Sequence, residues 1–231
     1  MKTYQPSLDL IPQFQQVASL TTLILVRHGE SEWNRAGRVQ GQVNSPLTDL
    51  GINQSKAIRD YLSGIILNQE LEIYTSPLDR AIQTAEIIAQ GINYPSSKII
   101  IEERLNDFNL GEISGIFGWE KVAEIFPEQA QLRLQDPMCF HPSGGESGAE
   151  FEARLRSLLE DLMDDGKLKL IVSHGIVNKF IRGILKNLSG KEMVELGESQ
   201  DTIYRLEQGE ETEIKIPPYK MEKKIETNSA C

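Results

Sequence analysis

The chain is poor in cysteine and histidine. Its 231 residues include two cysteines and three histidines, and Cys139 lies far from Cys231, the last residue. So few thiols build neither a disulfide framework nor a zinc ligand set. They are typical of a protein from a reducing compartment. In such a chain, a histidine at a special position is easy to notice.

Long apolar runs are also missing. The longest, such as LILV at residues 23–26 and GIIL at residues 64–67, are far too short to cross a bilayer. The opening segment MKTYQPSLDLIP carries an aspartate and prolines where a signal peptide needs an unbroken apolar core. We therefore expect a cytoplasmic protein without a membrane partner.

Positive charge is the third deficit. The chain has 24 lysines and arginines against 34 aspartates and glutamates, which gives a net charge of −10. An acidic surface repels nucleic acid and anionic lipid, so we expect no nucleic-acid partner. It repels phosphate esters as well. An anionic substrate would therefore need a locally positive pocket in an acidic body.

Strand and helix patterns alternate along most of the sequence. Short apolar runs indicate strands, and amphipathic stretches indicate helices. The alternation predicts an α/β fold, a three-layer αβα sandwich with a mainly parallel central sheet and an antiparallel edge strand. The predicted strands cover residues 22–26, 71–75, 98–101 and 168–173, followed by a hairpin or two edge strands at 202–216. The predicted helices cover residues 48–63, 77–91, 119–132, 148–165 and 175–188.

We expect a single domain at residues 21–216, which contain all of these predicted elements. Residues 1–20 are interpreted as an N-terminal extension, and residues 217–231 as a charged C-terminal tail. No internal repeat and no linker divides the central part of the chain.

Capping residues mark the starts of three predicted helices. Thr48 is a typical N-cap, and Ser76 is predicted to be another, with Pro77 at the first helical position. Ser147 and Glu150 have the spacing of a capping box. These signals favour helices that begin directly after a strand or loop.

Two of the three histidines follow buried strands. His28 comes two residues after the predicted strand at 22–26, and His174 follows the strand at 168–173 directly. Ligands of open α/β sheets bind at the carboxyl ends of the strands. Each histidine precedes a glycine, Gly29 or Gly175, which allows backbone N–H groups to approach a ligand closely.

Arginines occur at the same strand ends. Arg27 adjoins His28, and Arg80 lies in the first turn of the helix that follows the strand at 71–75. Guanidinium groups and helix N-termini favour a phosphate group. An arginine beside His28 disfavours a metal cation, and the sequence has no GxxxxGK[ST] phosphate loop. We expect neither a metal nor another cofactor.

Four stretches in this order, LVRHGESEWN, SPLDRAIQTA, PSGGES and VSHG, resemble the signature sequences of the histidine phosphatase superfamily, also called phosphoglycerate mutase-like. The resemblance covers roughly residues 22–206 and implies the fold of that family. It also implies that His28 attacks phosphorus and forms a phosphohistidine. Arg27, Arg80 and His174 would hold the phosphoryl oxygens, and Asn34 would also contact phosphate.

The proton donor departs from the family pattern. Phosphatase members have a glutamate in a segment similar to LNDFNLGEISG at residues 105–115, and Asp107 stands in its place. An aspartate can serve as the general acid if its pKa is raised, although its reach is one methylene shorter. Glu103, Glu112 and Glu146 are the alternative donors.

Several further residues are candidates for substrate contact. Gln40 and Gly41 follow the first signature stretch, and Gly175 follows the second histidine. Glu146 either stabilises the start of a helix, orients an arginine or accepts a bond from a substrate hydroxyl. The third histidine, His141, is better explained as an ordinary loop residue.

The resemblance favours a metal-independent phosphomonoesterase acting on a small phosphorylated metabolite. A phosphoglycerate mutase is the first alternative, but mutases of the family carry ERHYG where this chain has ERLND, and the spacing from His28 to His174 resembles that of the compact phosphatases. A module that binds a phosphorylated ligand without turnover is the second alternative. Assembly as a homodimer stays open.

Overall fold

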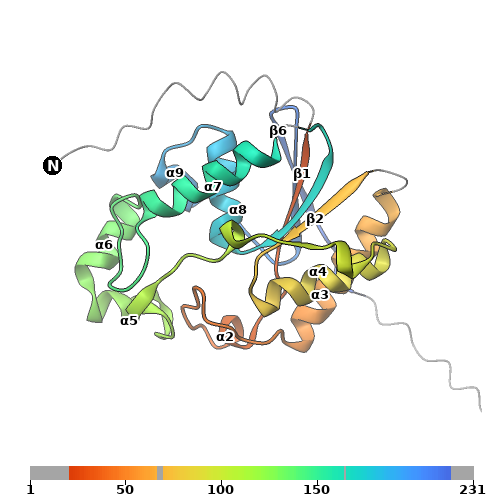
Figure 1. The fold of residues 1–231 in the computed structure, drawn as a ribbon. Helices are drawn as coiled ribbons and strands as arrows, with labels where there is room; N and C mark the ends of the chain where they lie inside the picture. Colours follow the sequence, from red (N-terminus) through yellow and green to blue (C-terminus); the bar gives the residue numbers. More distant parts are fainter. Residues whose placement is uncertain (1–20, 67–69, 164, 220–231) are drawn as a thin grey trace, which may run out of the picture.

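The computed structural model describes residues 21–66, 70–163 and 165–219 and contains a six-stranded sheet of order β3-β2-β4-β1-β5-β6 (Figure 1). The strands are β1 (Thr22–Arg27), β2 (Leu71–Thr75), β3 (Ile100–Ile101), β4 (Leu168–Ser173), β5 (Thr202–Glu207) and β6 (Glu210–Lys215). The α-helices are α2 (Glu32–Arg35), α3 (Asp49–Ile65), α4 (Asp79–Gly91), α5 (Gly118–Ile125), α6 (Pro127–Gln135), α7 (Gly148–Leu162), α8 (Gly175–Leu185) and α9 (Gly190–Glu195).

The directions of the strands confirm a mainly parallel sheet. The pairs β1–β4, β2–β4 and β2–β3 are parallel, whereas β5 runs antiparallel to β1 and to β6. The hairpin predicted at residues 202–216 is therefore present, and it forms one edge of the sheet. Its turn contains Gln208 and Gly209, both with positive φ.

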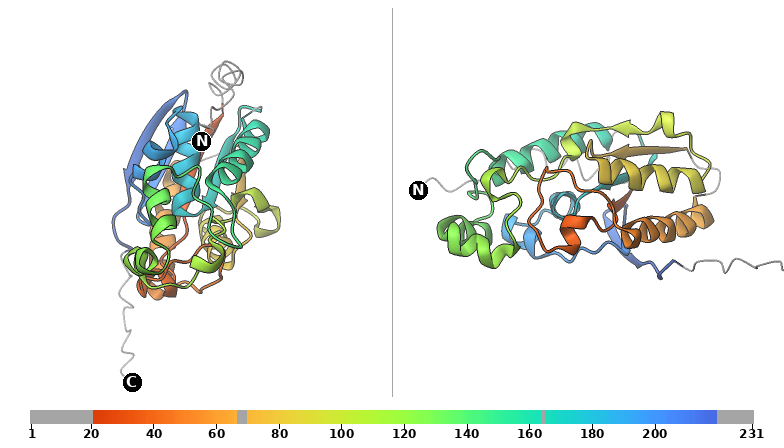
Figure 2. Two further views of the ribbon diagram at one scale, coloured as in Figure 1. Left: turned by 90° about the vertical axis from the view of Figure 1, so that its left-hand side faces the viewer. Right: turned by 90° about the horizontal axis from the view of Figure 1, so that it is seen from below.

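Side chains alternate between the two faces along each strand, so both faces of the sheet carry apolar side chains. Helices cover both faces. In β1, Leu23 and Leu25 pack in one hydrophobic cluster with residues of α7 and α8. Ile24 and Val26 belong to a second cluster, with residues of α3 and α4. This arrangement confirms the predicted three-layer sandwich. Figures 1 and 2 show α5 and α6 at one end of the molecule and α3 and α4 at the other.

The neighbouring strands β1 and β4 lead into opposite halves of the sheet. The chain passes from β1 through α3, on one face, to β2, whereas it passes from β4 through α8, on the other face, to β5. Because the two connections leave on opposite faces of the sheet, a crevice remains at the carboxyl ends of the two strands, where ligands of α/β proteins bind. His28 and His174 follow these two strands.

Two predicted caps are confirmed and one is wrong. The Thr48 side chain accepts a bond from the backbone N–H of Gly51, and Ser147 forms its capping box with Glu150. Helix α4 instead begins at Asp79 after Leu78, without a side-chain cap. The hydroxyl of Ser76 lies 2.8 Å from Nε2 of His174, and it accepts its local bond from the N–H of Leu78, before the helix begins.

The helix predicted at residues 119–132 is two helices, α5 and α6, which meet at Phe126. Pro127 begins α6, and a proline disfavours helical backbone in the residue before it. The third strand is shorter than predicted, because residues 96–98 form a 3-10 helix. Helices α2 and α9 were not predicted.

Gly29 has a packing role that differs from the expected one. A Cβ atom at this position would lie 2.2 Å from the carbonyl oxygen of Gly51, so the loop after β1 and the start of α3 touch backbone to backbone. The N–H of Gly29 donates to the hydroxyl of Thr84 in α4. Gly29 thus joins three segments below the site, whereas the sequence suggested an approach to the ligand.

None of the helices in the described part of the chain has the length and apolar character that a bilayer crossing requires. The N-terminal extension predicted at residues 1–20 lies outside the described residues, as does most of the tail predicted at 217–231. The cytoplasmic location, the homodimer and the division into one domain with two terminal segments stay predictions.

Candidate active site

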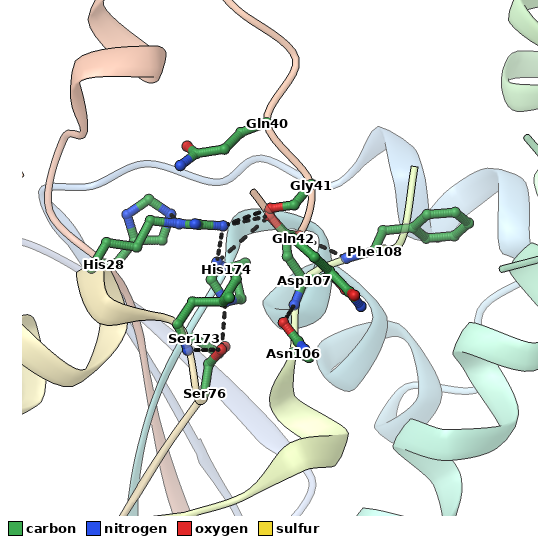
Figure 3. Close-up of polar contacts among 12 residues, drawn as sticks. His28, Gln40, Gly41, Gln42, Ser76, Asn106, Asp107, Phe108, Ser173 and His174 are labelled. Atoms are coloured by element: carbon green, nitrogen blue, oxygen red, sulfur yellow. Dashed lines mark hydrogen bonds and ion pairs between the residues drawn. The ribbon is translucent and has the colours of Figure 1, made fainter. Parts of the chain in front are cut away.

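The carboxyl ends of β1 and β4 bring His28 and His174 together. Arg27 and Ser173 are partners in the parallel register, and the N–H of His28 donates to the carbonyl of Ser173 over 2.9 Å. The two imidazole ring centroids lie 5.1 Å apart. Figure 3 shows both rings, with Asp107 and Ser76 beside His174. The predicted meeting of the two histidines is thus present.

Hydrogen bonds define the tautomer of His28. Its Nδ1 lies 2.8 Å from the carbonyl oxygen of Gly29, which can only accept, so Nδ1 carries the hydrogen. Nε2 then carries the unprotonated lone pair, which accepts a hydrogen bond from Nε of Arg80. Burial, Arg80 and Arg27 together hold the pKa of His28 well below 6.5, because each disfavours a positive imidazolium. His28 is therefore a neutral imidazole with Nε2 available as a nucleophile.

Arg80 lies beneath the site, fully buried. Its Nε donates to Nε2 of His28 over 3.2 Å, and its Nη groups donate to the carbonyls of Val43 and Gly41. The same guanidinium lies 3.2 Å from the carboxylate of Asp107. These bonds fix a buried positive charge directly below the imidazole of His28.

His174 has the opposite tautomer. Its Nδ1 lies 3.2 Å from Nη2 of Arg80, which can only donate, so the hydrogen is on Nε2 and points to the hydroxyl of Ser76. Burial lowers its pKa well below 6.5, and Arg80, His28 and Arg27 act in the same direction. His174 is therefore also neutral in the free protein.

Asp107 contacts Nη2 of Arg80, whereas His28 contacts Nε of the same guanidinium. Its Oδ1 accepts a bond from the N–H of Phe108, and its Oδ2 lies 3.2 Å from Arg80 and 3.6 Å from Nδ1 of His174. Burial raises the pKa of Asp107, although Arg80 and the N–H of Phe108 oppose the increase. The short side chain thus reaches the site, and its pKa is shifted in the direction that favours a general acid.

The alternative proton donors lie elsewhere. Glu103 and Glu112 are exposed and do not line the site. Glu146 is bound to Arg154 through both carboxylate oxygens and accepts a bond from the N–H of Asn109. It does not line the cavity described below, although it was predicted to bind substrate. Of its possible roles, orienting an arginine agrees with these contacts.

Arg154 in turn holds the segment that carries Asp107. Its guanidinium donates to the carbonyls of Arg104, Asn106 and Asp107. The pair of Glu146 and Arg154 therefore links α7 to the loop at residues 104–107. Its influence on the site acts through the position of Asp107.

The chain matches the family model described as histidine phosphatase superfamily (branch 1) over residues 23–215. The protein is a histidine phosphatase. Its sequence is 34% identical over 168 residues to a metal-independent phosphoserine phosphatase of Arabidopsis thaliana, covering 71% of this chain and 68% of that protein. It is 35% identical over 170 residues to a Photorhabdus laumondii protein named as a probable phosphoglycerate mutase, covering 71% and 74%.

A solved structure supports the same assignment. The phosphoserine phosphatase of Entamoeba histolytica, in complex with 3-phosphoglyceric acid, matches this histidine phosphatase with a TM-score of 0.68 and 29% identity. The match covers 80% of this chain and 89% of that one. The predicted family and fold are thus confirmed, and the protein is a phosphatase, a hydrolase of phosphate esters.

A cavity of about 360 Å³ opens above the two histidines of this phosphatase. Among the predicted site residues, those that line it are Arg27, His28, Asn34, Gln40, Gly41, Asp107 and Gly175. Arg80 and His174 support it from below. The guanidinium of Arg27 makes no hydrogen bond within the described residues, and its buried Nε has no partner. It is free to bind an anion in the cavity.

Asn34 and Gln40 are held by one another. The Asn34 amide donates to Oε1 of Gln40, and the hydroxyl of Ser31 donates to the same oxygen. Gly41 has a φ of 57° and lies against the carbonyl of Phe108, where a Cβ atom would come within 2.9 Å. A glycine is therefore needed where the loop after α2 meets the segment that carries Asp107.

Sequence reasoning missed several residues of the cavity. Glu198 lines it and is nearly fully buried, with bonds from Asn178 and Arg182. Arg133 and Lys179 also line it, from α6 and α8. None of these residues belongs to a signature stretch, so no local pattern could have identified them. They reach the site only because distant helices pack together.

Proposed function

We propose that the protein is a phosphomonoesterase that hydrolyses a small phosphorylated metabolite through a phosphohistidine on Nε2 of His28. The observation that carries the proposal is the neutral imidazole of His28, whose unprotonated Nε2 adjoins a buried guanidinium at the base of the cavity. A neutral imidazole is a good nucleophile near pH 7.

In the first step, Nε2 of His28 attacks phosphorus and the bond from phosphorus to the ester oxygen breaks. Asp107 gives its proton to the departing oxygen, which leaves as an alcohol. Arg80 transfers its Nε–H bond from His28 to a phosphoryl oxygen, and Arg27 binds another. These fixed cations stabilise the charge of the phosphoryl group in the transition state.

In the second step, a water molecule attacks the phosphohistidine. The carboxylate of Asp107 now accepts a proton from the water, the bond from phosphorus to Nε2 breaks, and inorganic phosphate leaves. Asp107 thus acts first as an acid and then as a base, so the proton that it donates in the first step is replaced by one from water in the second. The position of Oδ2 beside Arg80 and His174 supports this double role.

The first test is to trap the intermediate. The protein would be mixed with an aryl phosphate in the presence of EDTA, quenched in alkali, and digested for mass spectrometry of the peptide that contains residue 28. In the wild type we expect phosphate on His28. In His28→Ala we expect no phosphorylated peptide and no turnover. The matched control is His141→Ala, since His141 is exposed and lies outside the cavity. Turnover that survives in His28→Ala would overturn the proposal.

A mutase is the second candidate, because a relative named as a probable phosphoglycerate mutase is 35% identical to this chain. A mutase would pass the phosphoryl group to a second hydroxyl and would interconvert 2- and 3-phosphoglycerate. The relatives named as phosphoserine phosphatases make O-phosphoserine the first physiological ester to try. Release of inorganic phosphate without isomerisation would decide for the phosphatase, and a ligand that stabilises the protein without turnover would indicate a binding module.

A further inference from the structure

An acidic side chain, Glu198, lines the cavity beside Arg27. It belongs to the segment between α9 and β5, and its side chain is only 2% exposed. A Cβ atom at Gly175 would lie 3.4 Å from Cζ of Arg27 and 3.4 Å from Cγ of Glu198, so the two side chains flank this glycine at the start of α8. Because like charges repel, a carboxylate at this position weakens the binding of an anion to Arg27.

Two hydrogen bonds fix the carboxylate of Glu198. Its Oε1 accepts from the amide of Asn178 over 3.0 Å, and its Oε2 accepts from Arg182 over 3.2 Å. Arg182 is bound in turn to Glu211 over 2.7 Å, and its guanidinium carbon lies 3.6 Å from the ring centroid of Tyr204. Helix α8 and the β5–β6 hairpin therefore hold Glu198 in place, independently of the residues expected to bind phosphate.

The guanidinium of Arg27 lacks bonds of this kind. Its buried Nε has no partner, and within residues 21–66, 70–163 and 165–219 no ion pair joins it to a carboxylate. Burial lowers the pKa of Arg27, and the negative charges of Glu198 and Asp107 oppose this decrease. In the free enzyme, the charge of Arg27 is thus balanced across a short gap and not by a direct contact.

A fixed carboxylate beside an unbonded guanidinium stabilises its positive charge and also opposes an anion that binds to it. We propose that Glu198 is a positioning residue that acts through Arg27: it is the counter-charge of this guanidinium in the free enzyme, and it limits the affinity of the site for the phosphate product. This inference rests on the proposed function, in which Arg27 binds a phosphoryl oxygen. Weaker product binding favours turnover, because inorganic phosphate must leave before the next ester binds.

Inorganic sulfate tests the proposal directly, since it is a tetrahedral dianion that the enzyme cannot hydrolyse. Calorimetry at about pH 8.5 would measure its Kd where Glu198, with a pKa raised by burial to about 7, is ionised. We expect Glu198→Gln to bind sulfate about tenfold more tightly than the wild type. Glu198→Asp keeps the charge and should stay near the wild type. The matched control is Glu195→Gln, which removes an exposed acid of α9 outside the cavity and should leave the Kd unchanged.

The same comparison at lower pH separates the charge of Glu198 from its shape. The charged and titratable groups around it are Arg27 from β1, Lys179 and Arg182 from α8, Tyr204 from β5 and Glu211 from β6. The wild type and Glu198→Gln share these groups and Asp107, so their titration cancels in the ratio of the two Kd values. The ratio should be near one below about pH 5, where Glu198 is protonated, and should rise toward tenfold as the pH passes through about 7.

Two results would overturn the proposal. A ratio that does not change with pH would mean that the shape of the side chain, and not its charge, matters. Weaker sulfate binding by Glu198→Gln would mean that Glu198 only supports the local structure, since a misplaced Arg27 binds anions less well.

Steady-state kinetics give an independent measurement. In Glu198→Gln at about pH 8.5, the KM for p-nitrophenyl phosphate and the inhibition constant of inorganic phosphate should both fall severalfold, whereas kcat should change less, because the carboxylate acts on bound ester and transition state alike. A lower kcat with an unchanged KM would contradict this role. If Glu198→Gln tightens sulfate binding but turnover does not depend on His28, only the catalytic proposal fails.

Discussion

Arg80 joins the two reacting groups of the site, because its Nε lies 3.2 Å from Nε2 of His28 and its Nη2 lies 3.2 Å from Oδ2 of Asp107. One planar guanidinium thus sets the distance between the expected nucleophile and the expected acid. It also lowers the pKa of His28 and opposes the increase in the pKa of Asp107. The carbonyls of Gly41 and Val43 keep it in this orientation.

We expect Arg80→Lys to lower kcat/KM by roughly a hundredfold to a thousandfold, as removal of a preorganised donor does in other enzymes. A lysine presents its donors from one point and cannot reach His28, Asp107 and the two carbonyls together. Steady-state kinetics with an aryl phosphate would measure the loss. The control is Arg35→Lys, an exposed arginine at the end of α2, which should leave the kinetics unchanged. Equal kinetics for Arg80→Lys would contradict this role.

Asp107→Asn should reduce kcat in a way that depends on the leaving group. A phenolate with an electron-withdrawing group leaves without a proton, whereas an alkoxide needs one, so the loss should be small for p-nitrophenyl phosphate and about a hundredfold or more for O-phosphoserine. Asp107→Glu should restore part of the alkyl ester activity. Equal losses on both esters would mean that Asp107 acts only by orienting Arg80.

The pH dependence of kcat/KM should show activity that extends to acidic pH and declines as the pH rises. Burial and the two arginines hold the pKa of His28 well below 6.5, so the nucleophile stays neutral in mild acid. Burial raises the pKa of Asp107, and the acid form that donates the proton is lost as the pH rises through that value. A profile measured from about pH 4 to about pH 9 checks both limbs. The alkaline limb should disappear in Asp107→Asn, and an acid limb near 6.5 would argue against a neutral, buried His28.

Glu198 should make the stability of the protein depend on pH. Burial raises its pKa to about 7 from an ordinary value of 4.5. A carboxyl group whose pKa is raised in the folded protein contributes its full stabilisation when the pH lies below its pKa in the unfolded chain. This contribution is lost as the pH rises through about 7. The free energy of unfolding should therefore fall by roughly 3 kcal/mol across that window.

Urea denaturation at several pH values would measure this decrease. Glu198→Gln cannot ionise, so its free energy of unfolding should lack the corresponding slope between about pH 4.5 and about pH 7. Glu195→Gln, at an exposed position of α9, is the matched control and should keep the slope of the wild type. A slope that is unchanged in Glu198→Gln would show that Glu198 is already ionised at low pH.

Some elements were predicted correctly from contacts that lie within a few residues of one another. The capping box of Ser147 and Glu150 and the N-cap at Thr48 are of this kind. The sequence also signals the break at Pro127, because a proline disfavours helical backbone in the residue before it. Since this signal was not applied, one helix was predicted in place of α5 and α6. Helix α2 carries a similar signal, since Ser31 and Asn34 cap it reciprocally.

Ser76 shows where local reasoning fails. The sequence Ser76–Pro77 resembles a helix start, but the serine hydroxyl lies beside His174, 98 residues farther along the chain. The donor role of Asp107 is a similar case. The sequence left open whether a shorter acid could reach the site, and the position of Oδ2 beside Arg80 depends on how the loop at residues 104–107 is held by Arg154.

By itself, the sequence determined the family, the alternating fold and the strand ends that carry Arg27, His28 and His174, since periodicity and short motifs depend on neighbours along the chain. The tertiary structure decided the tautomers of the two histidines, the burial of Arg80 and the addition of Arg133, Lys179 and Glu198 to the cavity. These features depend on atoms that are distant in sequence and meet only when the helices pack, so no local pattern encodes them.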